Sequence, residues 1–223
     1  MNKQNRPAQL PEKEPHYTLG KISSRPGPML YPIPAVMVSC GDMEQSNILT
    51  IAWTGILNSV PPMTYISVRK SRYSHDIIRD SGEFVINLVT EDLARACDYC
   101  GVRSGASEDK FREAGLTKAA GEQVSAPMIA ESPVNLECRV FEVKELPSHD
   151  VFMAEIVAVH VREDLVDEKG AYHFERLDLV SYNHGHYYRV ERKSLGRFGF
   201  SVMKPKTIRR KRKEAAEKRK AKR

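Results

Sequence analysis

Side chains suited to holding an anion gather in one short stretch of the chain. Residues 63–69 read Met-Thr-Tyr-Ile-Ser-Val-Arg, and the period-two alternation of a strand places Tyr65, Ser67 and Arg69 on one face. The chain leaves this strand through four more polar-tipped residues: Ser71, Arg72, Tyr73 and Ser74. If Ser74 begins a helix, the free backbone N–H groups of its first turn point to the same place. The pattern favours an anion site over an ordinary strand end with surface charges.

A second group of side chains, slightly upstream, suits a flat apolar ligand. Trp53 is the single tryptophan and can lie against a ring face, although a tryptophan taken alone is more often a core residue than the wall of a cofactor site. Thr50, Asn58 and Ser59 can hydrogen-bond the edge of such a ring. Thr50 and Trp53 have opposite parity on a regular strand, so both reach one ring only if a bulge intervenes. A ligand that is flat at one end and doubly anionic at the other fits both groups, and flavin mononucleotide (FMN) is such a ligand.

The length of 223 residues permits one domain with appended tails. We expect a loose arm over residues 1–16, one domain over 17–200 and a basic appendage over 201–223. No apolar run approaches the length of about 18 residues that a membrane span needs. The first 15 residues are polar and lack the apolar middle of a secretory signal, so the sequence predicts a cytoplasmic protein without a membrane segment.

The formal net charge of +6 belongs to the end of the chain. Residues 204–223 hold 12 of the 35 Lys and Arg and two of the 29 Asp and Glu, which leaves 23 basic and 27 acidic residues, a net −4, elsewhere. A basic tail can bind nucleic acid by neutralising phosphates. A solvated extension is the favoured reading, because the rest of the chain carries no basic stripe that would continue a binding track.

The hydrophobic pattern is mainly that of β-strands. Strands are predicted at residues 35–39, 47–53, 63–69, 83–89, 135–144, 151–162 and 178–182, with residues 147–150 forming a hairpin turn. Short helices are predicted after Ser74, Thr90 and Ser107, the first ending near Gly82 and the last at Gly115. Many strands with few helices indicate a closed or nearly closed antiparallel β-barrel.

The remaining chemistry-bearing motifs are weaker. Cys97 and Cys100 form a C-x-x-C, but a zinc site needs two more ligands, so a buried packing role is favoured over thiol redox or metal binding. His184 and His186 alternate on a possible strand without a nearby third ligand, so no metal site is predicted. No hydrolase, P-loop or G-x-G-x-x-G pattern occurs. The redox chemistry of a flavin needs no catalytic side chain from the protein, and none is assigned.

At the residues of the proposed ring and anion sites the sequence resembles the flavin reductase-like family, the FMN-binding split barrels, and especially its flavoredoxin-like branch. The matching pieces are residues 47–53, 61–62, 65–69, 71–78, 82–87, 104–111 and 126–138. Their order and spacing make the match specific, and the likeness extends over residues 25–195. The basic tail lies outside it.

The resemblance implies a six-stranded Greek-key barrel with small helices and a homodimer that holds FMN near its interface. It also implies NADH or NADPH as electron donor, and a partner oxygenase or another electron acceptor. Asn47, Thr50 and Trp53 would lie by the flavin ring or ribityl chain, and Lys110 would add a cation at the phosphate. The residues expected to lie near the phosphate are Ser67, Arg69, Ser71, Tyr73 and Ser74. The segment 182–188 would approach the partner's flavin.

Overall fold

The computed structural model describes residues 20–21, 24–204, 207 and 210. The chain divides into two units, Met1–Leu30 and Tyr31–Arg223, and every element below belongs to the second unit. The expected arm 1–16 and most of the basic tail lie outside the described residues, so the predicted domain boundaries and the role of the tail stay predictions.

The second unit is mainly β, as predicted. Its strands are β1 (Ile33–Pro34), β2 (Val36–Gly41), β3 (Ser46–Ile51), β4 (Thr54–Ser59), β5 (Pro62–Arg69), β6 (Glu83–Leu88), β7 (Lys118–Ala119), β8 (Met128–Ile129), β9 (Val134–Glu145), β10 (His149–Val161), β11 (Val180–Asn183) and β12 (His186–Arg189). Between residues 31 and 204 its helices are α1 (Tyr73–Ser81), α2 (Ala94–Val102) and α3 (Lys110–Glu113), with 3₁₀ turns at Glu91–Leu93, Glu163–Leu165, Phe174–Arg176 and Phe200–Val202.

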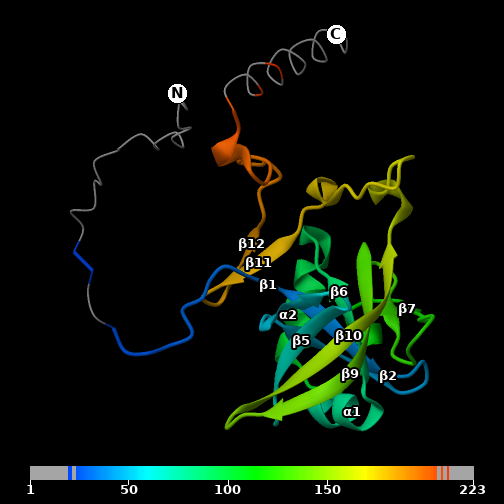
Figure 1. The fold of residues 1–223 in the computed structure, drawn as a ribbon. Coiled ribbons are helices and arrows are strands. Elements are labelled where there is room, and N and C mark those ends of the chain that lie inside the picture. Colours follow the sequence, from blue (N-terminus) through cyan, green and yellow to red (C-terminus); the bar gives the residue numbers. More distant parts are fainter. Residues whose placement is uncertain (1–19, 22–23, 205–206, 208–209, 211–223) are drawn as a thin grey trace. The chain divides into compact units, whose positions relative to one another are not determined.

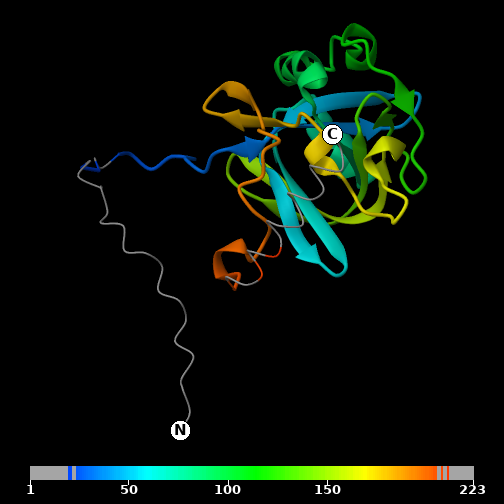
Figure 2. The same ribbon diagram turned by 90° about the horizontal axis from the view of Figure 1, so that it is seen from above.

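Seven strands form one antiparallel sheet in the order β3-β2-β6-β9-β10-β5-β4. Figure 1 shows β9 and β10 as a long hairpin across this sheet, with α1 below it. Seen from above in Figure 2, the hairpin of β4 and β5 extends away from α2 and α3. β3 and β4 lie at the two edges of the sheet yet follow each other in the chain, so the sheet curls into a barrel that stays split between them.

Alternate residues of the central strands contribute their side chains to two hydrophobic cores, one on each face of the sheet. Val36, Val38 and Cys40 of β2 pack inside the barrel with Phe84 and Phe152. Met37, between them, faces the opposite way and packs against the helices. Its cluster also contains Ile48, Leu93, Cys97, Cys100 and Phe111. β2 and β6 are therefore buried on both faces, which explains why their sequences are nearly continuous apolar runs.

The predicted strand 47–53 is wrong at its C-terminal end. β3 ends at Ile51, and the chain bends at Ala52 and Trp53 before starting β4. β4 pairs with β5 and has exposed residues through Ile56–Ser59, so its sequence lacks the apolar signal of a core strand. The large sheet consequently has seven strands where the resemblance implied six.

The three predicted helices are present with shifted starts. α1 begins at Tyr73, so Ser74 lies inside its first turn instead of capping it, and Gly82 in the left-handed conformation ends it. The 3₁₀ turn that follows Thr90 leads directly into α2. α3 is capped by Asp109, whose side chain accepts the N–H of Arg112, and Gly115 with positive φ ends it.

A small second sheet covers one side of the barrel. β1 pairs with β11, and β11 pairs with β12, so Tyr182 and Tyr187 stand opposite each other in the register. The strand predicted at 178–182 is thus confirmed, two residues later than expected, and β12 was not predicted as a separate strand. Among the described residues no helix is both long enough and apolar enough to cross a bilayer.

Candidate functional site

Two adjoining cavities open beside the split of the barrel, and residues of β3 and β5 line them. The large cavity has a volume of about 410 Å³ and is lined by Ala35, Leu49, Thr50, Ile51, Ala52, Trp53, Ser67, Arg69, Arg72, Asp98, Gly101, Val102, His149, Tyr182, Gly185 and Tyr187. The small cavity, of about 140 Å³, is lined by Asn47, Leu49, Thr50, Ser71, Arg72, Tyr73, Ser74, Cys100, Gly101, Val102, Arg103, Ser104, Gly105 and Lys110. Leu49, Thr50 and Arg72 belong to both linings, so the two cavities form one continuous site.

The small cavity collects groups that bind anions. Ser71 and Arg72 reach it from the turn between β5 and α1, and Tyr73 and Ser74 reach it from the first turn of α1. The first N–H groups of a helix have no intrahelical acceptor and carry the positive end of the helix dipole. Arg72 Nη1 donates to the carbonyl of Gly101 at 3.0 Å, which holds the guanidinium across the junction of the two cavities. A guanidinium, hydroxyls and a helix N-terminus thus meet at one place.

The buried pair Asn47 and Ser74 fixes the floor of the small cavity. Asn47 Nδ2 donates to Ser74 Oγ at 2.6 Å, and both residues are almost fully buried. Gly105 approaches this pair so closely that a Cβ atom there would lie 2.1 Å from Asn47 Oδ1. The loop that carries Ser104 and Gly105 can therefore reach the cavity only with glycine at position 105.

Lys110 enters the small cavity from α3, but its ammonium is largely occupied. Its Nζ donates to the carbonyls of Ile48 and Cys100, each at 2.8 Å. The residue is 4% exposed, and burial lowers the pKa of its ammonium. Lys110 therefore ties β3 to the end of α2, and one of its three N–H donors is left for another acceptor.

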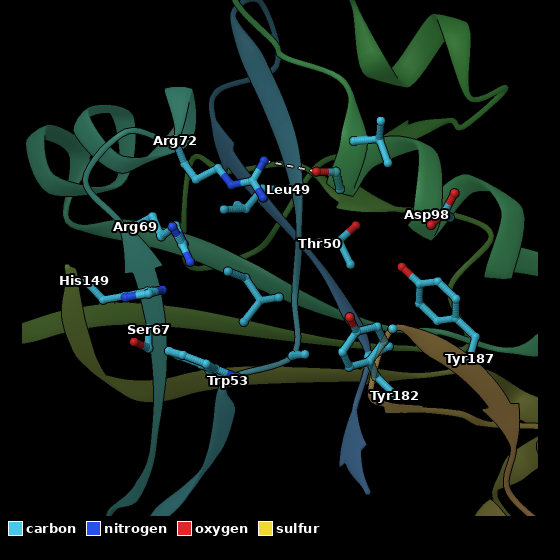
Figure 3. Close-up of a pocket in the computed structure, with 16 residues that line it drawn as sticks. Leu49, Thr50, Trp53, Ser67, Arg69, Arg72, Asp98, His149, Tyr182 and Tyr187 are labelled. Carbon is cyan, nitrogen blue, oxygen red and sulfur yellow. Dashed lines mark hydrogen bonds between the residues drawn. The ribbon is translucent and has the colours of Figure 1, made fainter. Parts of the chain in front are cut away.

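The large cavity has an aromatic wall at its lower end. Trp53 packs on His149, with ring centroids 4.7 Å apart, and Ser67 N donates to the Trp53 carbonyl at 2.9 Å. Burial, and then the charge of Arg69, lowers the pKa of His149 below its ordinary value, so its imidazole is neutral near pH 7. Figure 3 shows Arg69, His149, Ser67 and Trp53 together on this side of the cavity.

The opposite wall comes from the small sheet and from α2. Figure 3 shows Tyr182, Tyr187 and Asp98 facing the first wall, with Thr50 between the two walls. The rings of Tyr182 and Tyr187 meet edge to face at 5.5 Å. Burial, together with the neighbouring Cys97 and Asp98, raises the pKa of Tyr187, so its phenol stays protonated.

Thr50 joins the cavity wall to α2 through the Cys97 carbonyl, to which its hydroxyl donates. The four cysteines are unpaired and buried. Burial raises the pKa of Cys97 to about 12 and that of Cys100 to about 11, so both are neutral thiols that pack in the outer core. In the described part of the chain, no cluster of three or more His, Cys, Asp or Glu side chains is arranged to hold a metal.

The structure brings most of the predicted site residues together. Thr50, Trp53, Ser67 and Arg69 line the large cavity. The small cavity is lined by Asn47, Thr50, Ser71, Tyr73, Ser74 and Lys110. Thr50 and Trp53 both reach the site because β3 ends between them, not because of a bulge.

Asn58 and Ser59 do not reach either cavity. Both lie at the exposed far end of β4, where Asn58 Nδ2 donates to the Pro61 carbonyl. The prediction placed them near the ring because they follow Trp53 closely, but β4 carries them away from the site.

Several lining residues were not among the predicted site residues. Arg72 lies within the predicted segment and its side chain reaches the junction of the cavities. Asp98, His149, Tyr182 and Tyr187 come from segments far apart in the chain, and only the aromatic segment 182–188 carried a sequence signal. Nothing in the spacing of these residues indicates that they meet.

Comparison with known protein families agrees with this architecture. Residues 29–191 match the family model of the flavin reductase like domain. The chain belongs to the flavin reductase-like family. Two solved flavoredoxins resemble this family member closely. The flavoredoxin of Desulfovibrio vulgaris (Miyazaki F) is 34% identical with a TM-score of 0.75, and the alignment covers 83% of this chain and 100% of that one. The flavoredoxin from Methanosarcina acetivorans is 30% identical with a TM-score of 0.74, over 82% of this chain and 100% of that one.

An uncharacterized protein of Archaeoglobus fulgidus is 35% identical over 130 residues, which are 58% of this chain and 73% of that protein. The fold is therefore the split barrel of flavin reductase-like proteins, as the sequence predicted. The family includes NAD(P)H-dependent flavin reductases.

Proposed function

We propose that this flavin reductase-like protein binds FMN and transfers electrons through it, either from NADH or NADPH to flavin or from bound FMN to an acceptor. One observation carries the proposal. An aromatic cavity adjoins a smaller cavity lined by a guanidinium, hydroxyls and a helix N-terminus, and the two share Leu49, Thr50, Arg72, Gly101 and Val102.

The small cavity fits the phosphate of FMN. A phosphate dianion is held by charge-assisted hydrogen bonds and by helix N-termini. Ser71, Arg72 and the first turn of α1 supply these groups, and Arg69 adds a second guanidinium from the large cavity. Gly105 leaves open the space that a Cβ would take beside Asn47, which lets the loop of residues 103–105 close around the ligand.

The large cavity fits a flat ring that carries polar edges. Trp53 and His149 offer one aromatic wall, and Tyr182 and Tyr187 offer the other. Thr50, with Leu49 and Ile51, lies on edge strand β3, whose outward backbone groups face the cavity. These backbone donors suit the carbonyl and imide edge of a flavin, and Arg69 suits negative charge that develops there.

When bound, FMN supplies the redox chemistry by accepting a hydride and giving up electrons. The chain's own task is then to position the ring, exclude water from one of its faces and keep its own groups in fixed protonation states. His149 is neutral and Tyr187 is protonated near pH 7, so neither places an additional charge beside the ring.

A pyridine nucleotide would bind without a dinucleotide domain of its own. The sequence has no G-x-G-x-x-G fingerprint, so the nicotinamide would stack directly in the open part of the large cavity. The electron acceptor, whether a partner oxygenase or another protein, would approach the same opening.

We also propose that the protein acts as a homodimer. Large apolar side chains are exposed on the barrel, among them Ile56, Leu57 and Val60 of the β4–β5 hairpin and Phe141 of the central strand β9. Contiguous exposed apolar surface marks association sites. Light scattering of the purified protein should give a mass near 51 kDa, twice the 25.3 kDa of one chain.

The function is tested with the FMN-loaded protein in the absence of oxygen. Purified protein should be yellow and release FMN on heating. Addition of NADH or NADPH should bleach the flavin absorbance if the protein is a reductase. Bleaching by neither nucleotide, with reduction by dithionite intact, would remove the reductase activity and leave the electron carrier. A colourless protein that fails to bind added FMN would contradict both.

A further inference from the structure

Asp150 is a buried carboxylate that lines neither cavity, although its neighbour His149 does. It is the second residue of β10 and stands opposite Val68 of β5, while His149 stands opposite Arg69. Successive side chains of a strand point to opposite faces. His149 and Arg69 therefore face the cavity, and Asp150 faces the core, where its side chain is 7% exposed.

The two carboxylate oxygens of Asp150 hold the two ends of the turn that lines the small cavity. Lys70 Nζ lies 3.2 Å from Oδ1, and His75 Nε2 lies 2.8 Å from Oδ2. This turn comprises Ser71–Ser74, the last two residues of which begin α1. Lys70 directly precedes it, and His75, also in α1, directly follows it. The turn between them presents its polar groups to the cavity, while its flanking residues are fixed from behind by one carboxylate.

Further contacts keep this arrangement in place. The other ring nitrogen of His75 lies 2.9 Å from Asp76 Oδ1, and its ring meets the edge of Phe152 in the core. Burial alone would raise the pKa of Asp150, but His75 and Lys70 together hold it below its ordinary value. The carboxylate is thus ionised at neutral pH and has a partner on each side, the condition under which a buried charge is tolerated.

We propose that Asp150 is a positioning residue for phosphate recognition, which acts through Lys70 and His75 by fixing the turn Ser71–Ser74 before the ligand arrives. The inference rests on the proposed FMN function and deepens it. Groups that bind a ligand must be held within about 0.5 Å of the productive geometry. A turn that is already ordered binds more tightly, because less conformational entropy is lost on binding.

Direct electrostatics and positioning predict opposite results at this residue. Asp150 is negative and lies behind the site of a dianion, so by charge alone its neutralisation should tighten FMN binding. If Asp150 positions the turn, the same neutralisation releases Lys70 and His75 and should weaken FMN binding. The sign of the change therefore separates the two explanations.

The experiment compares FMN with riboflavin, which lacks the phosphate, by calorimetry on the full-length apoprotein. For Asp150→Asn we expect FMN affinity to fall roughly tenfold, the equivalent of one hydrogen bond to a charged group, and riboflavin affinity to change less than about twofold. Glu137→Gln is the matched control. Glu137 is also buried, and it accepts the N–H groups of Glu122, Gln123 and Val124; none of these four residues lines either cavity. That variant should lose thermal stability while keeping the wild-type ratio of the two affinities.

A second variant covers the case in which Asp150→Asn does not fold. Lys70 is 44% exposed, so Lys70→Gln should fold. Measured at about 1 M salt, where the Debye length is about 3 Å, its loss of FMN affinity cannot come from a screened surface charge. A selective loss of about threefold or more for FMN supports positioning. Unchanged or tighter FMN binding in the folded variants, or an equal loss for riboflavin, overturns it. Failure of the wild-type protein to bind FMN would instead remove the proposed function.

Discussion

The two ends of the site are built in different ways. The end that we propose for the phosphate (the phosphate end) is assembled mainly from one segment, Arg69–Ser74, which passes from β5 into α1. The end that we propose for the flavin ring (the ring end) takes Trp53, Asp98, His149 and Tyr187 from four distant parts of the chain. The phosphate end is thus a local structure that β5 and α1 nearly specify by themselves, whereas the ring end exists only once the whole barrel and the small sheet have formed.

The contacts behind the two ends differ as well. Behind the phosphate end lie buried polar contacts: the Asn47–Ser74 hydrogen bond, the Lys110 ammonium on two carbonyls and the Asp150 carboxylate. The ring end is held mainly by contacts between aromatic side chains, which tolerate small shifts. We therefore expect the phosphate end to be selective for its ligand group and the ring end to accept different ring-bearing molecules. This would suit a site that an electron donor and an electron acceptor occupy in succession.

The largest expected effect is at the phosphate end. Changing Arg69 and Ser71 together to Ala should weaken FMN binding by about 3 kcal/mol or more, given roughly 1.5–3 kcal/mol for each hydrogen bond to a charged group. Riboflavin binding should change far less. Titration calorimetry with both ligands measures the difference, and equal losses for the two ligands would show that the phosphate lies elsewhere.

The next effect tests how tightly the phosphate end is packed. Gly105→Ala places a methyl group on Asn47 Oδ1, so Asn47 must move and lose its hydrogen bond to Ser74. We expect a loss of about 1–3 kcal/mol in the free energy of unfolding, together with weaker FMN binding. Gly27→Ala, where a Cβ meets only the flexible end of Met29 at 3.8 Å, is the control. Denaturant melts of both variants measure the change, and a Gly105 variant as stable as the control would contradict the packing.

A smaller effect is expected at the ring end. Trp53→Ala removes the aromatic wall but no charged contact, so FMN and riboflavin should lose the same affinity, about 1 kcal/mol. Trp53→Phe should restore most of it. Because Trp53 is the only tryptophan, quenching of its fluorescence in the unmutated protein should report ligand binding in the large cavity directly. Binding without quenching would place the ring away from this wall.

The smallest effect concerns His149 and pH. Burial and Arg69 lower the pKa of His149 in the folded protein below the ordinary value of 6.5. The unfolded chain then binds more protons in this range, so the stability tied to His149 is complete above pH 6.5 and is lost as the pH falls below it. His149→Gln should flatten the change in the free energy of unfolding between pH 7 and about 5.5. A profile identical to that of the unmutated protein would show that His149 does not contribute.

The same difference between the two ends determined which site residues could be predicted from the sequence. Residues 63–74 show a strand and a helix start in direct succession, so Arg69, Ser71 and Ser74 could be placed at one site from local pattern alone. Asp98 and His149 carry no such pattern, because their positions depend on the packing of α2 and on the β5–β10 register. Asn58 and Ser59 were misplaced because β4 is an exposed strand without an alternating apolar pattern, so no strand was predicted there.

The helices illustrate the same limit. Their ends were predictable, because Gly82 and Gly115 adopt left-handed conformations that glycine favours. The start of α1 was not, because Ser74 uses its hydroxyl to accept a hydrogen bond from Asn47, a partner 27 residues away that no local rule includes.

The bend at Ala52 and Trp53 has a consequence for how the protein can diverge. It leaves β3 as an edge strand, paired with β2 on one side and facing the large cavity on the other. A guest molecule there would be met by peptide groups that mutation cannot replace, in the manner of an added strand. Relatives could then replace most surrounding side chains and still bind the same molecule. Relatedness within this fold should therefore be more reliably detected from the path of the main chain than from residue identity.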